Sequence, residues 1–278
     1  MRKRWNRWLI RDAQSNIHAA HLRRLRLQDI HVGAVRTAIL LLLLSGWEWG
    51  AQTGWIDPFL FSSPSRIWEL FLQMVATGDL FHHIGLTAME TVAGFLLGTA
   101  AGTGLATLIW ASPFLSRVLD PYLVVLNSMP KVALGPLFIV TIGAGFGSIL
   151  AMAVAITIVI TTLVIHSAFQ SVDPDYHKLA RAFGASRRQL FLTIIFPACI
   201  PEMIATLKVN VGLAWVGVIV GEFLVSKEGL GYLIIYGFQV FNLNLVLLSL
   251  VLVALCATLM YQVVNRLERR LLRHRDLE

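Results

Sequence analysis

Six long apolar stretches dominate the sequence and constrain its fold more than any other feature. They cover residues 34–54, 86–110, 118–142, 148–169, 203–225 and 243–263. A helix of about 20 apolar residues is long enough to cross the hydrocarbon core of a bilayer. The chain is 56% hydrophobic and 14% charged, whereas soluble domains are about 25% charged. These features exclude a soluble globular or disordered chain and predict an all-α integral membrane protein with six transmembrane helices.

Basic residues predict how the chain crosses the membrane. The net charge is +7, and Lys and Arg are concentrated in residues 1–35, in the 171–201 loop and in residues 268–278. Because basic loops stay on the cytoplasmic side, both termini and this loop are expected there. We therefore expect a multi-pass membrane protein in which two basic tails, 1–35 and 268–278, flank a membrane domain at 36–267. The N-terminal tail is either a helix lying on anionic lipid or a solvated tail.

The motifs of common enzymes are absent from the sequence. No GxxxxGK[ST] loop is present, because the Gly-rich segment 143–147 lacks the lysine that would reach a phosphate. Neither an HExxH nor a CxxC motif occurs, so no metal site is predicted. The basic residues are explained by membrane topology, and no nucleic-acid partner is expected. The chain is thus not expected to be an enzyme or to bind a cofactor itself.

The 171–201 loop is unusually well organised for a connection between two spans. Asp173 is a candidate N-cap with Pro174 at the first helical position. Gly184 suits a left-handed helix end, and Ser186 with Gln189 forms a candidate capping box. An apolar stripe lies between these signals, made of Tyr176, Leu179, Ala180 and Phe183. Such a stripe either docks into a groove on a partner or packs under the helices of this chain.

The same loop resembles the EAA loop of ABC importer permeases, the binding-protein-dependent inner-membrane components. The matching residues are Ala180, then Gly184-Ala185-Ser186, and finally Pro197 after Phe196. Lys178 stands where the family has Glu, and Leu179 replaces the first Ala. Residues 127–136, 212–222 and 229–232 are similar to signatures of the nitrate/sulfonate/taurine group, and the resemblance extends over about residues 60–267.

The resemblance implies a type I ABC importer domain with cytoplasmic coupling helices. Two permease copies, expected to be identical, would form the pathway. Two cytoplasmic ATPase subunits would carry ATP and Mg, and an extracytoplasmic solute-binding protein would deliver the solute. The residues expected to couple to the ATPase are Tyr176, Lys178, Leu179, Ala180, Arg181, Phe183, Gly184, Ala185 and Arg187.

Ionisable groups in the spans are candidates for the solute pathway, because charges in lipid are costly and are usually functional. Glu90, Lys131, Lys208 and Glu222 are such groups. Lys131 lies in a stretch broken by Pro121, Pro130 and Pro136, and irregular backbone at membrane depth is tolerated where it lines a cavity or is covered by protein. The pathway candidates are Asn127, Ser128, Lys131, Trp215 and Glu222. The alternatives are that Lys131 and Glu222 reach the membrane surface and that Trp215 packs in the core or faces lipid.

The expected solute is small and anionic, of the nitrate, sulfonate or taurine type. A pyrimidine vitamin precursor or an aromatic acid is the alternative solute, and a membrane-embedded enzyme or scaffold is the alternative class.

Glycines four residues apart, at 94, 98 and 102 and at 217 and 221, allow close helix approach. That approach is either packing within the chain or contact between two copies.

Overall fold

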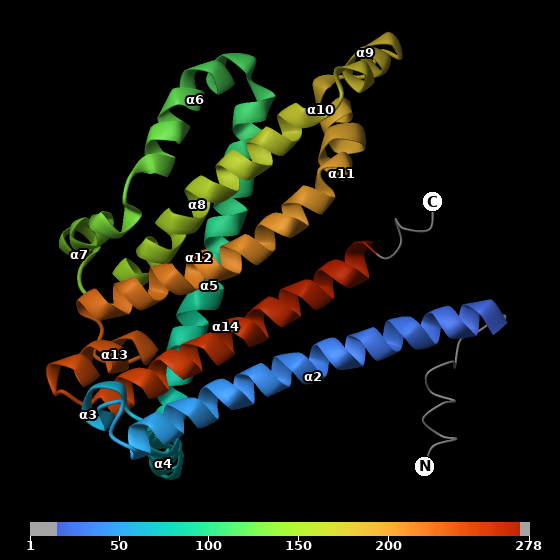
Figure 1. Ribbon diagram of the computed structural model, residues 1–278. Coiled ribbons are helices and arrows are strands. Elements are labelled where there is room, and N and C mark those ends of the chain that lie inside the picture. The colour runs from blue at the N-terminus through green and yellow to red at the C-terminus, as the bar shows by residue number, and fades with distance from the viewer. Residues whose placement is uncertain (1–15, 273–278) are drawn as a thin grey trace. The chain divides into compact units, whose positions relative to one another are not determined.

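A computed structural model describes the backbone of residues 16–272 and the side chains of residues 24–270. All regular secondary structure between residues 16 and 272 is helical (Figure 1). The elements are α2 (Asn16–Gln52), α3 (Pro58–Phe61), α4 (Pro64–Thr77), α5 (Asp79–Ala111), α6 (Pro113–Ser128), η1 (Lys131–Leu134), α7 (Gly135–Ile142), α8 (Phe146–Ser171), α9 (Pro174–Ala182), α10 (Arg187–Leu190), η2 (Phe191–Ile195), α11 (Phe196–Ala198), α12 (Ile200–Val225), α13 (Leu230–Gln239) and α14 (Leu243–Leu272). The predicted all-α class is confirmed.

Five helices in the described part of the chain are long and apolar enough to cross a membrane. They are α2 from Arg24 onward, α5, α8, α12 and α14. The third expected span, residues 118–142, is not a single straight helix. Helix α6 and the η1–α7 segment meet there at an angle of 90° and form either a broken span or a re-entrant loop. Met129 and Pro130 are extended at the bend. For Met129 this follows from the clash between the Pro130 ring and the residue before it.

The chain divides into two compact units, and residues up to Trp68 form the first. Helix α2 runs without a break through the 35/36 boundary at which we expected the basic tail to end. Near its C-terminal end, the Glu48 carboxylate accepts hydrogen bonds from the Ser65 amide at 3.0 Å and from the Ser65 hydroxyl at 2.9 Å. These bonds hold the start of α4 against the end of α2.

The second unit is built on close packing of α5, α8 and α12. Gly94, Gly98 and Gly102 of α5 lie against α8, where Ala153, Thr157 and Thr161 fill the space that a side chain would need. Gly217 and Gly221 of α12 lie against α8 in the same way. The glycine spacing therefore serves packing within the chain. Small residues allow this approach where lipid supplies no hydrophobic driving force between helices.

A polar contact at the centre of this packing joins the same three helices. The Asn210 amide of α12 donates to the Thr99 hydroxyl of α5 at 2.8 Å and to the Thr161 hydroxyl of α8 at 2.7 Å. Asn210 and Thr161 are fully buried. Because lipid offers no alternative partner, these bonds fix the register of α12 against both neighbours.

Helix α13 is an element that the sequence did not lead us to expect. Its ten residues, Leu230–Gln239, are apolar but too few to cross a membrane. It lies in the connection between α12 and α14 and packs against both. The sequence pattern does not separate α13 from the spans around it, because the helix is short, is apolar and begins soon after the long apolar helix α12.

Lys208 of α12, expected to be functional because it is charged, forms an ion pair with Glu268 of α14. The Lys208 Nζ to Glu268 Oε2 distance is 2.7 Å, and the two side chains are 26% and 17% exposed. The sequence pointed to the lysine but not to its partner. The pair connects the last turns of α14 to the first half of α12.

Replacing Lys208 with methionine is expected to lower the free energy of unfolding by about 2 kcal/mol. Removal of one partner leaves a half-buried charge unpaired, and the partial exposure keeps the loss below that of a fully buried pair. The double variant Lys208→Met, Glu268→Leu is expected to regain most of this loss. Thermal unfolding in detergent measures both. A double variant that is destabilised by the sum of the two single losses would show that the pair is not coupled.

Candidate functional site

Helix α9 forms as its sequence predicts and presents an apolar surface. The Asp173 carboxylate caps the helix by accepting from the Asp175 amide at 2.8 Å, with Pro174 at its start. Ala180 is buried, whereas Tyr176, Leu179 and Phe183 are 55%, 55% and 83% exposed. The apolar stripe therefore divides: its smallest residue packs inward and its three large residues face outward.

The predicted left-handed turn at Gly184 and the predicted capping box after it are both present. Gly184 has φ +74°, in the left-handed region, and the Ala185 amide donates to the Ala180 carbonyl at 2.9 Å. This closes the end of the helix in the manner expected of a glycine there. The Ser186 hydroxyl then accepts from the Gln189 amide, and the Gln189 side chain accepts from the Ser186 amide, which completes the capping box of α10.

Buried side chains attach the base of the loop to the bundle. Ala180, Leu190 and Ile195 share a core with Phe169 of α8. The Phe191 ring lies 4.8 Å from that of Trp110 and 5.3 Å from that of Phe169, measured between centroids. Aromatic contacts of this kind add to the energy of burial. The base of the loop is therefore close-packed against α5 and α8.

The chain between α10 and α12 is helical but irregular. A π-helical turn, η2, precedes Pro197, and Cys199 separates α11 from α12 with Pro201 in the first turn. Proline has no amide hydrogen, so the regular ladder cannot continue through either position. The expected interruption before the fifth span is therefore present, as a local change of helix type.

A polar contact that sequence reasoning missed connects the loop to another helix corner. The Arg187 guanidinium donates to the Ala111 carbonyl at 3.2 Å, where α5 ends. The next residue, Ser112, caps α6 by accepting from the Leu115 amide at 3.3 Å. Arg187 thus joins the 171–201 loop to the corner between α5 and α6. No local pattern reveals this, because the two residues are far apart in sequence.

The remaining charged residues of α9 are exposed. Lys178 lies 2.7 Å from Asp175, one helical turn away, and the two side chains are 77% and 78% exposed. A pair this exposed contributes little to stability. Arg181 is also exposed on α9.

The structure brings together three of the five pathway candidates. Asn127 and Ser128 end α6 and are exposed, and the Lys131 ammonium donates to the Asn127 carbonyl at 2.9 Å across the bend. The other two lie in the interior of the second unit. Trp215 is 5% exposed and packs with Phe95, and Glu222 is fully buried. Neither buried side chain can touch a solute in this conformation.

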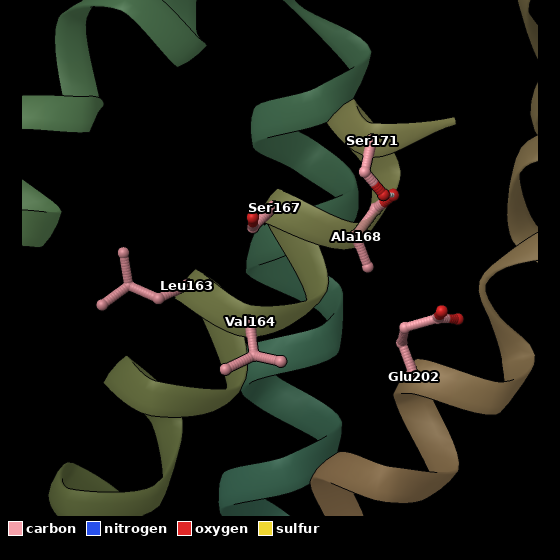
Figure 2. Close-up of a pocket in the computed structure, with 6 residues that line it drawn as sticks. All are labelled: Leu163, Val164, Ser167, Ala168, Ser171 and Glu202. Carbon is pink, nitrogen blue, oxygen red and sulfur yellow. Dashed lines mark hydrogen bonds between the residues drawn. The ribbon is translucent and has the colours of Figure 1, made fainter. Parts of the chain in front are cut away.

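A pocket of about 520 Å³ lies beside the base of the 171–201 loop. Figure 2 shows its lining side chains, all from α8 except Glu202, which lies in the first turn of α12. Its polar groups are the Ser167 and Ser171 hydroxyls and the Glu202 carboxyl group. The sequence does not predict this pocket; its only signal there is that Ser167 and Ser171 lie one helical turn apart on α8.

The fold and the site define a class: a polytopic helical membrane protein with a helical loop that projects apolar side chains beyond its bundle. Residues 94–273 match the profile of the family described as binding-protein-dependent transport system inner membrane component. The chain belongs to this family, and it is a multi-pass inner-membrane permease component rather than an enzyme.

Relatives agree on this assignment over most of the chain. An ABC transporter permease protein of Haemophilus influenzae is 32% identical over 222 residues, which cover 78% of this chain and 89% of the relative. RibX of Chloroflexus aurantiacus, a riboflavin transport system permease protein, is 31% identical, with coverage of 84% and 87%. SsuC of Bacillus subtilis, assigned by its name to aliphatic sulfonate transport, is 27% identical, with coverage of 84% and 85%.

Matches to nitrate and taurine permeases place the chain in the nitrate/sulfonate/taurine group of ABC importer permeases. Among solved structures, a bacterial ABC transporter involved in alginate import is similar. Its TM-score is 0.61 at 15% identity, with coverage of 88% of this chain and 96% of that chain. This similarity establishes the type I permease fold, and the expected fold class is confirmed.

Proposed function

We propose that this chain couples ATP-driven motion of a cytoplasmic ATPase to alternating access of a solute pathway. The observation that supports the proposal most directly is the exposed surface of Tyr176, Leu179 and Phe183 on α9. A helix with such anchors fits a hydrophobic groove on a partner. The buried base of the loop and the Arg187–Ala111 contact provide routes to α5, α6 and α8.

Family membership implies a partner ATPase and a binding protein in general. We propose two identical permease copies, two ATPase subunits that hold ATP and Mg, and an extracytoplasmic solute-binding protein. The 171–201 loop then faces the cytoplasm, with both termini on the same side. The basic residues of the loop and the C-terminal region support this orientation. Lys178, which stands where the family has Glu, would contact acidic groups on the ATPase.

We propose that the solute is small and anionic. The similarity to nitrate, taurine and sulfonate permeases supports this class, as does the ammonium of Lys131 beside the exposed Asn127 and Ser128. Trp215 and Glu222 would influence the pathway only indirectly, through the packing of α12. A pyrimidine vitamin precursor remains the second candidate, because ThiX of Halalkalibacterium halodurans, a formylaminopyrimidine transport permease protein, is 31% identical over 201 residues.

Replacing Phe183 with serine tests the docking surface. The side chain is 83% exposed, so its loss leaves the bundle intact while it removes an apolar anchor worth about 2 kcal/mol, or more than tenfold in affinity. The full chain, tagged at its C-terminus, is purified in mild detergent from its host. The P-loop ATPase that accompanies it is identified and quantified by mass spectrometry. We expect at least a tenfold loss of bound ATPase.

Trp55→Ser is the matched control, since Trp55 is 87% exposed but lies outside the loop. It is expected to retain the ATPase at the wild-type level. Equal ATPase recovery with Phe183→Ser and the wild type would contradict docking through α9. Absence of any ATPase from the wild-type preparation, even after cross-linking through the 171–201 loop, would contradict the coupling function as a whole.

A further inference from the structure

Two acidic side chains meet inside the bundle, at the end far from the 171–201 loop. Glu90 of α5 and Glu222 of α12 are 2% and 0% exposed. Thr87, one helical turn before Glu90 on α5, donates to Glu222 at 2.7 Å, and the two carboxyl groups interact with each other. Two ionised carboxylates that lie side by side and away from water would repel each other strongly. The contact therefore requires a proton on one of the two carboxyl groups, as in other closely paired acids.

Glu222 is surrounded by donors. Its Oε1 accepts from the Thr87 hydroxyl at 2.7 Å, and its Oε2 accepts from the Gly231 amide at 2.5 Å. A carboxyl group that receives several hydrogen bonds is stabilised in its charged form. This arrangement assigns the negative charge of the pair to Glu222.

Glu90 has the opposite environment. Its Oε2 is buried and receives no N–H or O–H donor from the described residues outside the pair. A second negative charge at this position would be both desolvated and adjacent to a carboxylate, which is very costly. A proton on Glu90 removes that charge and allows Glu90 to donate a hydrogen bond to Glu222.

We propose that Glu90 and Glu222 form a binding site for one proton, and that this proton keeps the connection between α12 and α13 attached to α5. The connection is already linked to α5 by two bonds. The Gly229 amide donates to His83 Nδ1 at 2.9 Å, and the Leu230 amide donates to the Thr87 hydroxyl at 2.8 Å. Thr87 and Gly231 both donate to Glu222. A shift of the Glu222 carboxylate would therefore also displace the connection from its hydrogen bonds to α5.

A pocket of about 430 Å³ gives the proton a route to solvent. Glu90 is part of its lining, as are Ser226, Lys227 and Glu228 of the connection. Other titratable groups near the site belong to the same elements. His83 contacts the connection from α5, Tyr232 lies at the start of α13 and stacks on His83 at 6.3 Å, and Glu228 is hydrogen-bonded to His82 at 2.8 Å, which lowers the pKa of Glu228.

Loss of the proton would bring two negative charges into contact, and the two side chains would separate. The space around them is limited: a methyl group at Gly231 would already lie 2.7 Å from Glu222 Oε2. The connection at 226–231 would therefore have to move away from α5. The site links the protonation of one buried pair to the position of α13.

Infrared spectroscopy of the full chain in lipid nanodiscs tests the site. At neutral pH the wild-type protein is expected to show the carbonyl band of a buried protonated carboxyl group, shifted in D₂O. Glu90→Gln should lose this band and remain folded, because the glutamine amide still donates to Glu222. Glu228→Gln, at an exposed acid, should keep it. A wild-type protein without the band, or a Glu90→Gln variant that retains it, would overturn the proposal.

Hydrogen exchange of residues 226–232 tests the mechanical consequence. After correction for the intrinsic effect of pH, exchange in the wild type is expected to rise at least tenfold at alkaline pH. In Glu90→Gln it should be independent of pH, since this variant has no proton to lose at position 90. The same rise in both proteins would show that the pair does not control the connection.

Discussion

Gly184→Val is expected to reduce ATPase binding by this chain about tenfold or more while the folded membrane domain persists. Gly184 has φ +74°, and no neighbouring atom lies within 4 Å of the position that a Cβ atom would occupy there. The penalty is therefore conformational: a left-handed backbone costs an ordinary residue about 1–2 kcal/mol and a β-branched residue more. We expect the turn after α9 to change shape in the variant because this avoids the conformational cost. The change would move the side chains of Phe183 and Leu179.

Gly184→Asn is the matched variant for this prediction, because asparagine tolerates the left-handed region. It is expected to keep most of the ATPase binding. Co-purification of the ATPase measures binding, and the thermal unfolding midpoint in detergent checks that both variants fold. If valine and asparagine lowered binding equally, the shape of the turn would not be what the partner recognises.

Gly217→Ala is expected to have the largest effect on stability, a loss of about 2–3 kcal/mol in the free energy of unfolding. A Cβ atom at Gly217 would lie 2.5 Å from the Ala153 Cα and 3.0 Å from its amide nitrogen. Backbone atoms of α8 cannot rotate away as a side chain can. The two helices must separate, and overpacking of this kind typically costs about 1–3 kcal/mol.

Gly212→Ala, on the same helix, is the control for this substitution. Gly212 is exposed and has no atom within 4 Å of the new Cβ position. There the change is expected to be neutral or to stabilise by up to about 1 kcal/mol, since alanine favours a helix over glycine. Thermal unfolding in detergent compares the two variants. Similar midpoints would contradict close packing of α8 on α12.

Much of the candidate site follows from local sequence. Asp173, Gly184 and the Ser186–Gln189 box each act within a few residues of themselves, and the structure contains all three as expected. The same holds for the long apolar helices, since their length and composition suffice to identify them. Local backbone chemistry of this kind is the same in a short peptide as in the folded chain.

The pathway candidates were more difficult to assign from sequence. Asn127, Ser128 and Lys131 share one bend and lie together. Glu222 is a candidate because a charged group is costly in lipid, and Trp215 because it could face the pathway, yet both are buried among neighbours of this chain. A polar residue in a span shows that a partner is needed, but not whether that partner is a solute or another helix.

The sequence by itself determined the membrane-spanning class, the caps and turn of the 171–201 loop, and the resemblance to ABC importer permeases, because each depends on composition or on neighbours within a few residues. Only the tertiary structure decided the 90° bend of the third apolar stretch, the pairing of Lys208 with Glu268, the Arg187 contact with the end of α5 and the meeting of Glu90 with Glu222. Those features join distant parts of the chain. Which distant groups meet is set by how helices pack, through the glycines that permit close approach and the polar groups that cannot remain unpaired in lipid.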